Sequence, residues 1–171
     1  MEVYTHRGIG LGPEQTHASF TAAAALGINI EADVRKTRDN VLVMFHGHPL
    51  AKTTNGTGEI EEKTYAELEE LDAGAWYDKA FKSEKIPTFE ELLIKYGSWV
   101  ERIDVEIKKM NKNTPEHNGI DVLRKVEEYD LVDRFLFTSF YPQVIYDIKT
   151  NRHPKPNFNA KFHRHSFSDC Y

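Results

Sequence analysis

The side chains in this sequence best suited to chemistry are two histidines, three carboxylates and two cations. They lie in four short segments of the first 108 residues: His6 and Arg7, Glu31 and Asp33, His46, and Glu106 and Lys108. Three carboxylates supply hard oxygen ligands, which suit Mg²⁺ or Ca²⁺ better than Zn²⁺. Two imidazoles can serve as general base and general acid, because the unperturbed histidine pKa of about 6.5 leaves both protonation states accessible at neutral pH.

The two cations extend this chemistry to phosphate. Arg7 offers a planar fork that matches phosphate oxygens, and Lys108 offers a compact point charge. A divalent cation, an acid–base pair and a phosphate clamp are the parts needed to break a phosphodiester. The residues alone therefore predict metal-assisted cleavage of a phosphodiester.

Strands with alternating polarity must position these groups. In residues 28–34, Glu31 and Asp33 share one face while aliphatic residues share the other, and residues 102–108 repeat the pattern with Glu106. Residues 3–6, 41–46 and 135–140 are expected to form further strands. Only a short polar turn separates 28–34 from 41–46, which predicts an antiparallel hairpin. A turn centred between residues 39 and 40 would place His46 opposite Asp33.

Helical patterns alternate with these strands. They cover about 14–26, closed by Gly27, a short helix from Thr64, a helix from Thr88 to about Tyr96, and the segments 114–129 and 142–150. Such alternation predicts an α/β fold with a mostly parallel sheet. A doubly wound sheet is one solution. A barrel fits better, because the strands carry charge on one face, as at an inner wall, and aliphatic residues on the other.

On these residues the chain resembles the glycerophosphodiester phosphodiesterase family. The matching segments run in order from residue 4 to about 149: His6-Arg7-Gly8, Pro13-Glu14-Gln15-Thr16, Ile30-Glu31-Ala32-Asp33-Val34, Phe45-His46, Leu71-Asp72-Ala73-Gly74, Ile86-Pro87-Thr88-Phe89-Glu90-Glu91, Asp104-Val105-Glu106-Ile107-Lys108 and Ser139-Phe140. The resemblance implies a TIM-type barrel with a small insertion at about 47–85. It also implies hydrolysis of glycerophosphodiesters to an alcohol and glycerol 3-phosphate.

The resemblance also assigns roles. Metal binding falls to Glu31, Asp33 and Glu106, catalysis to His6 and His46, and phosphate binding to Arg7 and Lys108. Two local departures stand out. The family usually has His-Asp where this chain has His46-Gly47, and Asn where this chain has Gln15.

Length sets this chain apart from a complete barrel. Its 171 residues are fewer than the roughly 250 typical of eight strands, and only five strands are predicted. Residues 1–151 are therefore expected to form an incomplete barrel. Residues 152–171 hold four Lys or Arg against one acid and have no Ile, Leu, Val or Met, which predicts a basic tail without a strand or helix. The alternative function is an inactive barrel fragment, or a homo-oligomer that pairs its open sheet edges.

Composition excludes several other classes of protein. The net charge of -5 does not indicate a nucleic-acid-binding protein. The longest apolar stretch is far shorter than the roughly 18 residues of a membrane span. No secretory signal is visible at the N-terminus, and the single cysteine, Cys170, cannot form an internal disulfide. We expect a cytoplasmic protein without a membrane span or a nucleic-acid partner.

Overall fold

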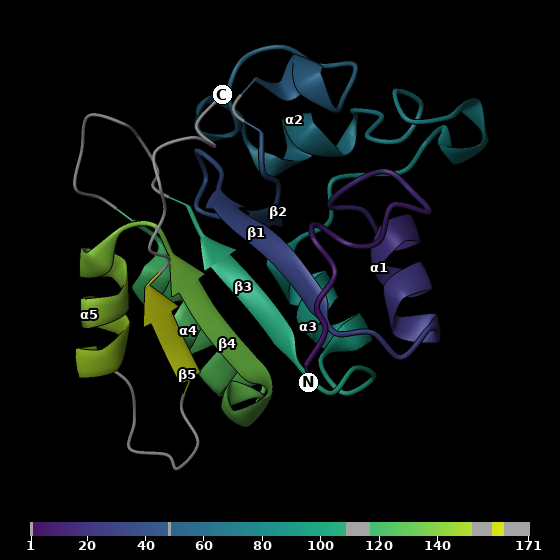
Figure 1. The fold of residues 1–171 in the computed structure, drawn as a ribbon. Coiled ribbons are helices and arrows are strands. Elements are labelled where there is room, and N and C mark those ends of the chain that lie inside the picture. The colour runs from purple at the N-terminus through teal and green to yellow at the C-terminus, as the bar shows by residue number, and fades with distance from the viewer. Residues whose placement is uncertain (1, 48, 109–116, 152–158, 163–171) are drawn as a thin grey trace.

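A single mixed sheet organises the molecule. The computed structural model describes residues 2–47, 49–108, 117–151 and 159–162 (Figure 1). The five-stranded sheet has the order β2-β1-β3-β4-β5. Only β2 runs antiparallel to its neighbour, whereas β1, β3, β4 and β5 are parallel. The strands are β1 (Ile30–Lys36), β2 (Leu42–Met44), β3 (Ile103–Ile107), β4 (Phe135–Ser139) and β5 (Asn159–Phe162).

The set of five strands differs from the predicted set at both ends of the chain. Residues 3–6 do not form a strand; they make one parallel bridge, Tyr4 with Asn29, and the Thr5 N–H donates to the Asn29 carbonyl at 2.8 Å. The chain then turns away, because Arg7 adopts a left-handed backbone with φ of 59°.

The expectation that the tail supplies no strand is also wrong. Residues 159–162 form β5, which pairs in parallel with β4. Backbone groups at an open sheet edge can pair with a segment that lacks Ile, Leu, Val and Met, and Ala160 packs against the main core, so composition alone did not exclude a strand here. The remainder of residues 152–171, including Cys170, lies outside the described residues.

The helices agree with their capping signals. They are α1 (His17–Ala25), α2 (Tyr65–Glu69), α3 (Phe89–Tyr96), α4 (Gly119–Glu128) and α5 (Pro142–Asn151). Capping boxes at Thr64 and Thr88 are confirmed, and Gly27 has a positive φ of 68° after α1. Helix α1 begins later than expected, because Gln15 has a φ of 59°, which no α-helix accommodates. The start predicted for α4 at residue 114 lies outside the described residues.

The hairpin between β1 and β2 forms as predicted, but its register is shifted by one residue. Val34 lies opposite Met44, not opposite Phe45. The loop is longer than a two-residue turn, since the Thr37 N–H donates to the Val41 carbonyl at 2.9 Å and Asn40 has a φ of 67°. His46 therefore does not pair with Asp33 in the hairpin.

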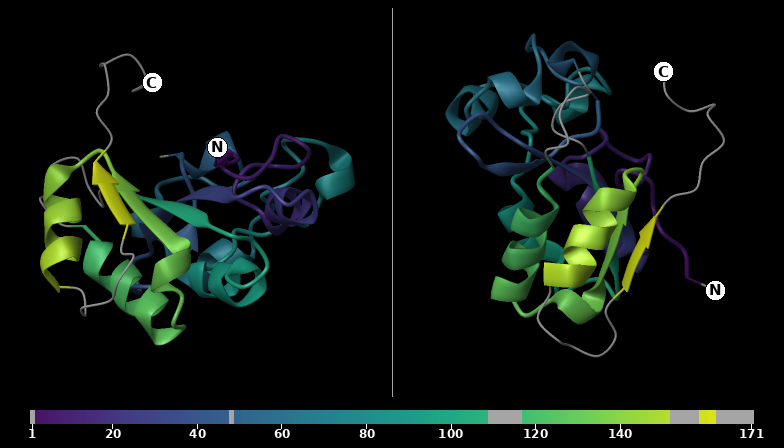
Figure 2. Two further views of the ribbon diagram at one scale, coloured as in Figure 1. Left: turned by 60° about the horizontal axis from the view of Figure 1, so that its bottom comes forward. Right: turned by 90° about the vertical axis from the view of Figure 1, so that its left-hand side faces the viewer.

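The apolar face of the sheet carries the main core. Alternate residues of β1 and β3 are fully buried against the helices, namely Ile30, Ala32, Val34, Ile103, Val105 and Ile107. Side chains from α1, α3, α4 and α5 complete this cluster, and Figure 2 shows the helices gathered along the sheet. Among the residues that the structure describes, no helix has both the length and the apolar character needed to cross a membrane.

The segment between β2 and α3 forms a second, smaller core at the carboxyl ends of the strands (Figures 1 and 2). It contains α2 and 3-10 helices at Leu50–Lys52, Ile60–Glu62 and Lys79–Phe81. A fourth 3-10 helix, Val132–Arg134, leads into β4. Arg35 of β1 ties the segment to the sheet, because its buried guanidinium donates to Glu61 Oε1 at 2.6 Å. The predicted insertion thus packs over the edge of the sheet where the candidate site lies.

Candidate active site

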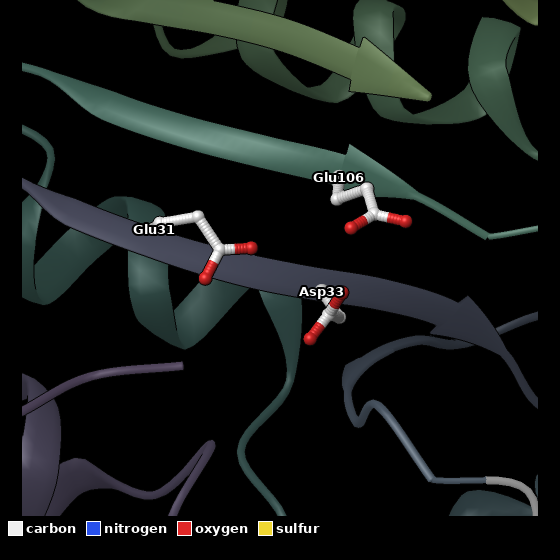
Figure 3. Close-up of side chains that lie close together, drawn as sticks. All are labelled: Glu31, Asp33 and Glu106. Carbon is white, nitrogen blue, oxygen red and sulfur yellow. The ribbon is translucent and has the colours of Figure 1, made fainter. Parts of the chain in front are cut away.

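Parallel register places four carboxylates together on one face of the sheet. Glu31 lies opposite Asp104, and Asp33 lies opposite Glu106. Side chains two residues apart on a strand share a face, so the pairs form a square across β1 and β3. Figure 3 shows Glu31, Asp33 and Glu106 turned toward one another in front of these two strands.

Three of these carboxylates are close enough to share one ion. One oxygen from each of Glu31, Asp33 and Glu106 lies within 4.8 Å of the others. Asp33 Oδ1 is buried and has no partner in hydrogen-bond geometry, although Lys108 Nζ lies 2.7 Å away as an ion-pair contact. The same ammonium lies 2.5 Å from Glu106 Oε1. Lys108 thus pairs with two of the three carboxylates, and the three acidic oxygens form a donor set that suits a hard divalent cation.

Three carboxyl groups of this site have raised pKa values, because burial and neighbouring carboxylates disfavour their charged forms. Burial raises the pKa of Glu31 to about 8, and the nearby Asp33 carboxylate adds to this rise. Burial also raises the pKa of Glu106 to about 7, against the opposing effect of Lys108, and the pKa of Asp104 to about 6. A hard divalent cation would compensate this charge, so the donor set fits Mg²⁺ or Ca²⁺.

Arg7 connects the N-terminal loop to the carboxylates. Its backbone N–H donates to Glu31 Oε2 at 2.7 Å, and its guanidinium Nη1 lies 3.3 Å from Glu14 Oε2. Arg7 Nε lies 3.7 Å from Asp33 Oδ2. The left-handed backbone at Arg7 makes the first contact possible, because it turns the N–H toward β1.

His46 reaches the site from just beyond β2. Its Nε2 lies 2.8 Å from Arg7 Nη2, and because a guanidinium only donates, Nε2 must be the acceptor. The ring is therefore neutral with its proton on Nδ1. Burial lowers the pKa of His46 to about 3. Nδ1 is buried and has no partner among the described residues, and the neighbouring residue, where the family usually has Asp, is Gly47.

His6 is an exposed residue close to Arg7, Asp33 and Lys108. Partial burial lowers the pKa of His6, and the positive charge of Arg7 lowers it further. The Asp33 and Glu14 carboxylates oppose this shift. Within the described part of the chain, the His6 ring makes no hydrogen bond. All seven residues that the sequence singled out are thus brought to one end of the sheet.

Two residues of this site received no role from the sequence. Asp104 is 9% exposed and accepts a hydrogen bond from Thr138 Oγ1 at 2.7 Å. Its place could have been found by aligning β3 with β1, since that register puts it opposite Glu31. Gln15 donates from Nε2 to Asp33 Oδ2 at 2.6 Å. No periodic pattern marks Gln15, because it lies in a loop.

This chain is similar to known proteins over most of its length. The model of the glycerophosphoryl diester phosphodiesterase family matches residues 6–161. A glycerophosphodiester phosphodiesterase from Caldanaerobacter subterraneus subsp. tengcongensis is 34% identical over 151 residues, which cover 86% of this chain and 61% of the relative.

Solved structures are similar as well. A glycerophosphodiester phosphodiesterase from Agrobacterium tumefaciens superposes with a TM-score of 0.81 at 28% identity, covering 94% of this chain and 65% of the other. An Oleispira antarctica phosphodiesterase, in complex with the product sn-glycerol-3-phosphate, gives 0.80 at 30% identity, covering 95% and 65%. These relatives are TIM-type barrels, and the sheet described above is consistent with part of one. The chain spans less than two thirds of each of these three proteins. It belongs to the glycerophosphoryl diester phosphodiesterase family.

Proposed function

We propose that this chain hydrolyses glycerophosphodiesters to an alcohol and glycerol 3-phosphate with the help of Mg²⁺ or Ca²⁺. The observation that carries the proposal is the cluster of Glu31, Asp33 and Glu106, whose oxygens lie within 4.8 Å of one another beside two imidazoles and two cations. The product bound to the Oleispira antarctica relative supports the same product class here.

The three clustered carboxylates would hold the cation. Once bound, it would polarise a phosphoryl oxygen and lower the pKa of the attacking hydroxyl. Asp104 stays outside this ligand set in the proposal, because its Oδ1 already accepts from Thr138.

Arg7 and Lys108 would bind the phosphate. Lys108 remains protonated, since the Asp33 and Glu106 carboxylates raise its pKa although burial alone would lower it. Arg7 lies between the carboxylates and His46. A phosphate that binds the Arg7 guanidinium would therefore break the hydrogen bond from Arg7 Nη2 to His46 Nε2. Substrate binding would then free the imidazole nitrogen for proton transfer.

His6 and His46 would share the proton transfers. His6 is exposed, so its ring can take up a proton from solvent and would donate it to the departing alkoxide. His46, once released by Arg7, would have a free lone pair on Nε2 and would accept the proton of the nucleophile. The nucleophile is either water or the glycerol 2-hydroxyl of the substrate, and a cyclic glycerophosphate in quenched reactions would identify the second.

Hydrolysis of glycerophosphocholine and glycerophosphoethanolamine tests the proposal. Purified protein should release glycerol 3-phosphate with Mg²⁺ or Ca²⁺ and not with chelator, and His6→Ala should abolish the release. His17→Ala is the matched control, because His17 contacts Tyr96 and not the carboxylate cluster. No turnover by folded, cation-binding protein would favour the inactive alternative. Sedimentation of the same sample tests whether copies pair through their sheet edges.

A further inference from the structure

The Gln15 side chain makes two hydrogen bonds to Asp33, one with its carboxylate and one with its backbone N–H. Its Nε2 donates to Asp33 Oδ2 at 2.6 Å, and its Oε1 accepts from the Asp33 backbone N–H at 3.3 Å. Gln15 is only 3% exposed, and its backbone has a left-handed φ of 59°. A residue other than glycine rarely adopts this conformation, so surrounding contacts must hold the side chain in place.

The loop around Gln15 also carries the phosphate-binding candidate. The Gln15 N–H donates to the Arg7 carbonyl at 2.9 Å, and the Arg7 N–H donates to Glu31 Oε2 at 2.7 Å. Two of the three clustered carboxylates are therefore held by one short loop. The Asp33 contacts come from the Gln15 side chain, whereas the Arg7 contact comes from its backbone and would survive substitution.

The amide of Gln15 orients the Asp33 carboxyl group without adding a charge to the site. Gln15 donates to Oδ2, which also lies 3.7 Å from Arg7 Nε, whereas Oδ1 lies 2.7 Å from Lys108 Nζ. One oxygen of this carboxylate lies within 4.8 Å of oxygens of Glu31 and Glu106. A neutral donor fixes the rotamer of a carboxylate without neutralising it, and partners of this kind tune metal affinity in proteins.

We infer that Gln15 is a positioning residue, which orients Asp33 so that Oδ1 is presented to the divalent cation. This inference rests on the proposed metal-dependent function. The Gln15 side chain spans from a left-handed loop position to the carboxylate and the backbone N–H of Asp33.

Cation affinity in the absence of substrate is the measurement that tests this role. Chelator-treated protein is titrated with CaCl₂ and with MgCl₂ in a calorimeter, while circular dichroism and thermal melting monitor folding. Gln15→Leu removes both polar contacts at similar volume and should weaken binding about ten- to a hundredfold. Gln15→Asn should recover part of that loss. In Gln15→Leu, kcat should approach the wild-type value at saturating cation, which a purely structural defect would not allow.

Gln143→Leu is the matched control, because Gln143 also donates to an aspartate, Asp147, but lies on α5 outside the site. Wild-type affinity in folded Gln15→Leu would overturn the inference and leave the proposed function intact. Absence of cation binding by the wild-type protein would overturn both. If Gln15→Leu does not fold, Gln15→Met removes the same contacts with an unbranched side chain and is judged by the same criterion.

Discussion

The two faces of β1 and β3 are almost equally buried but opposite in chemistry. On one face, residues such as Val34 and Val105 have no exposed surface and pack against the helices. On the other, Asp33 and Glu106 are only 1% and 8% exposed, yet both are ionisable carboxyl groups. Burial stabilises the first face, at roughly 25 cal/mol per Å² of apolar surface. On the second face it works against the charged form, as the raised pKa values of Glu31 and Glu106 record.

This comparison separates what holds the protein together from what it does. Removing side chains from the apolar face should lower stability and spare the site. Neutralising side chains on the polar face should remove function and spare stability. Four measurements test that separation.

The largest effect is expected from Glu106→Gln. The change keeps the size of a proposed cation ligand and removes its charge, so kcat/KM for glycerophosphocholine should fall about a thousandfold, and the response to Mg²⁺ or Ca²⁺ should disappear. Thermal melting in chelator should show little change in stability, because the lost ion pair with Lys108 opposes the gain from no longer burying a carboxylate charge. Full activity in this variant would contradict the assignment of Glu106.

Ile103→Ala changes the same strand on its other face. Ile103 is fully buried in the main core, so the free energy of unfolding should fall by about 3 kcal/mol. Urea denaturation measures this loss, and kcat/KM at a temperature where the variant is folded should match the wild type. A drop in activity of folded Ile103→Ala would show that the two faces are not independent.

The pH dependence of stability in chelator should report the polar face directly. The native pKa of Glu31 is about 8 against 4.5 for the free side chain, so the native state holds a proton that the unfolded state has lost. Stability should therefore fall as pH rises from 6.5 to 8, by roughly 2 kcal/mol.

This window avoids His46, whose lowered pKa reduces stability only as pH falls below about 6.5. Denaturation at several pH values gives the slope. Glu31→Gln should reduce the slope and leave the smaller contribution of Glu106, whose pKa is raised to about 7. Saturating Ca²⁺ should reduce it as well. An unchanged slope in Glu31→Gln would assign the effect to other groups.

The smallest effect is expected from Thr88→Ala, which touches neither face. Thr88 Oγ1 accepts from the Glu91 N–H at 3.1 Å and caps α3. Its loss should lower stability by about 1 kcal/mol without changing kcat/KM, and Thr88→Ser should restore the stability. Thermal unfolding checks both variants; an unaffected melting temperature in Thr88→Ala would show that the cap contributes nothing.

Local signals in the sequence predicted most of the elements and the members of the site. Capping boxes at Thr64 and Thr88 located two helices, and alternation in β1 and β3 located the carboxylates. The errors came where backbone hydrogen bonding overrides side-chain pattern. β5 pairs with β4 although Ala160 is its one side chain packed against the main core in the described residues, and the three-residue loop that ends at Asn40 shifted the hairpin by one residue.

The sequence by itself determined which side chains share a face, because alternation along a strand is a local property of the backbone. It also carried the family resemblance, through short segments in order. Tertiary structure alone decided that Asp104 stands opposite Glu31, that His46 meets Arg7, and that Gln15 reaches Asp33. Those contacts join residues 18 or more positions apart, and their geometry depends on strand register and on left-handed turns that no local pattern encodes.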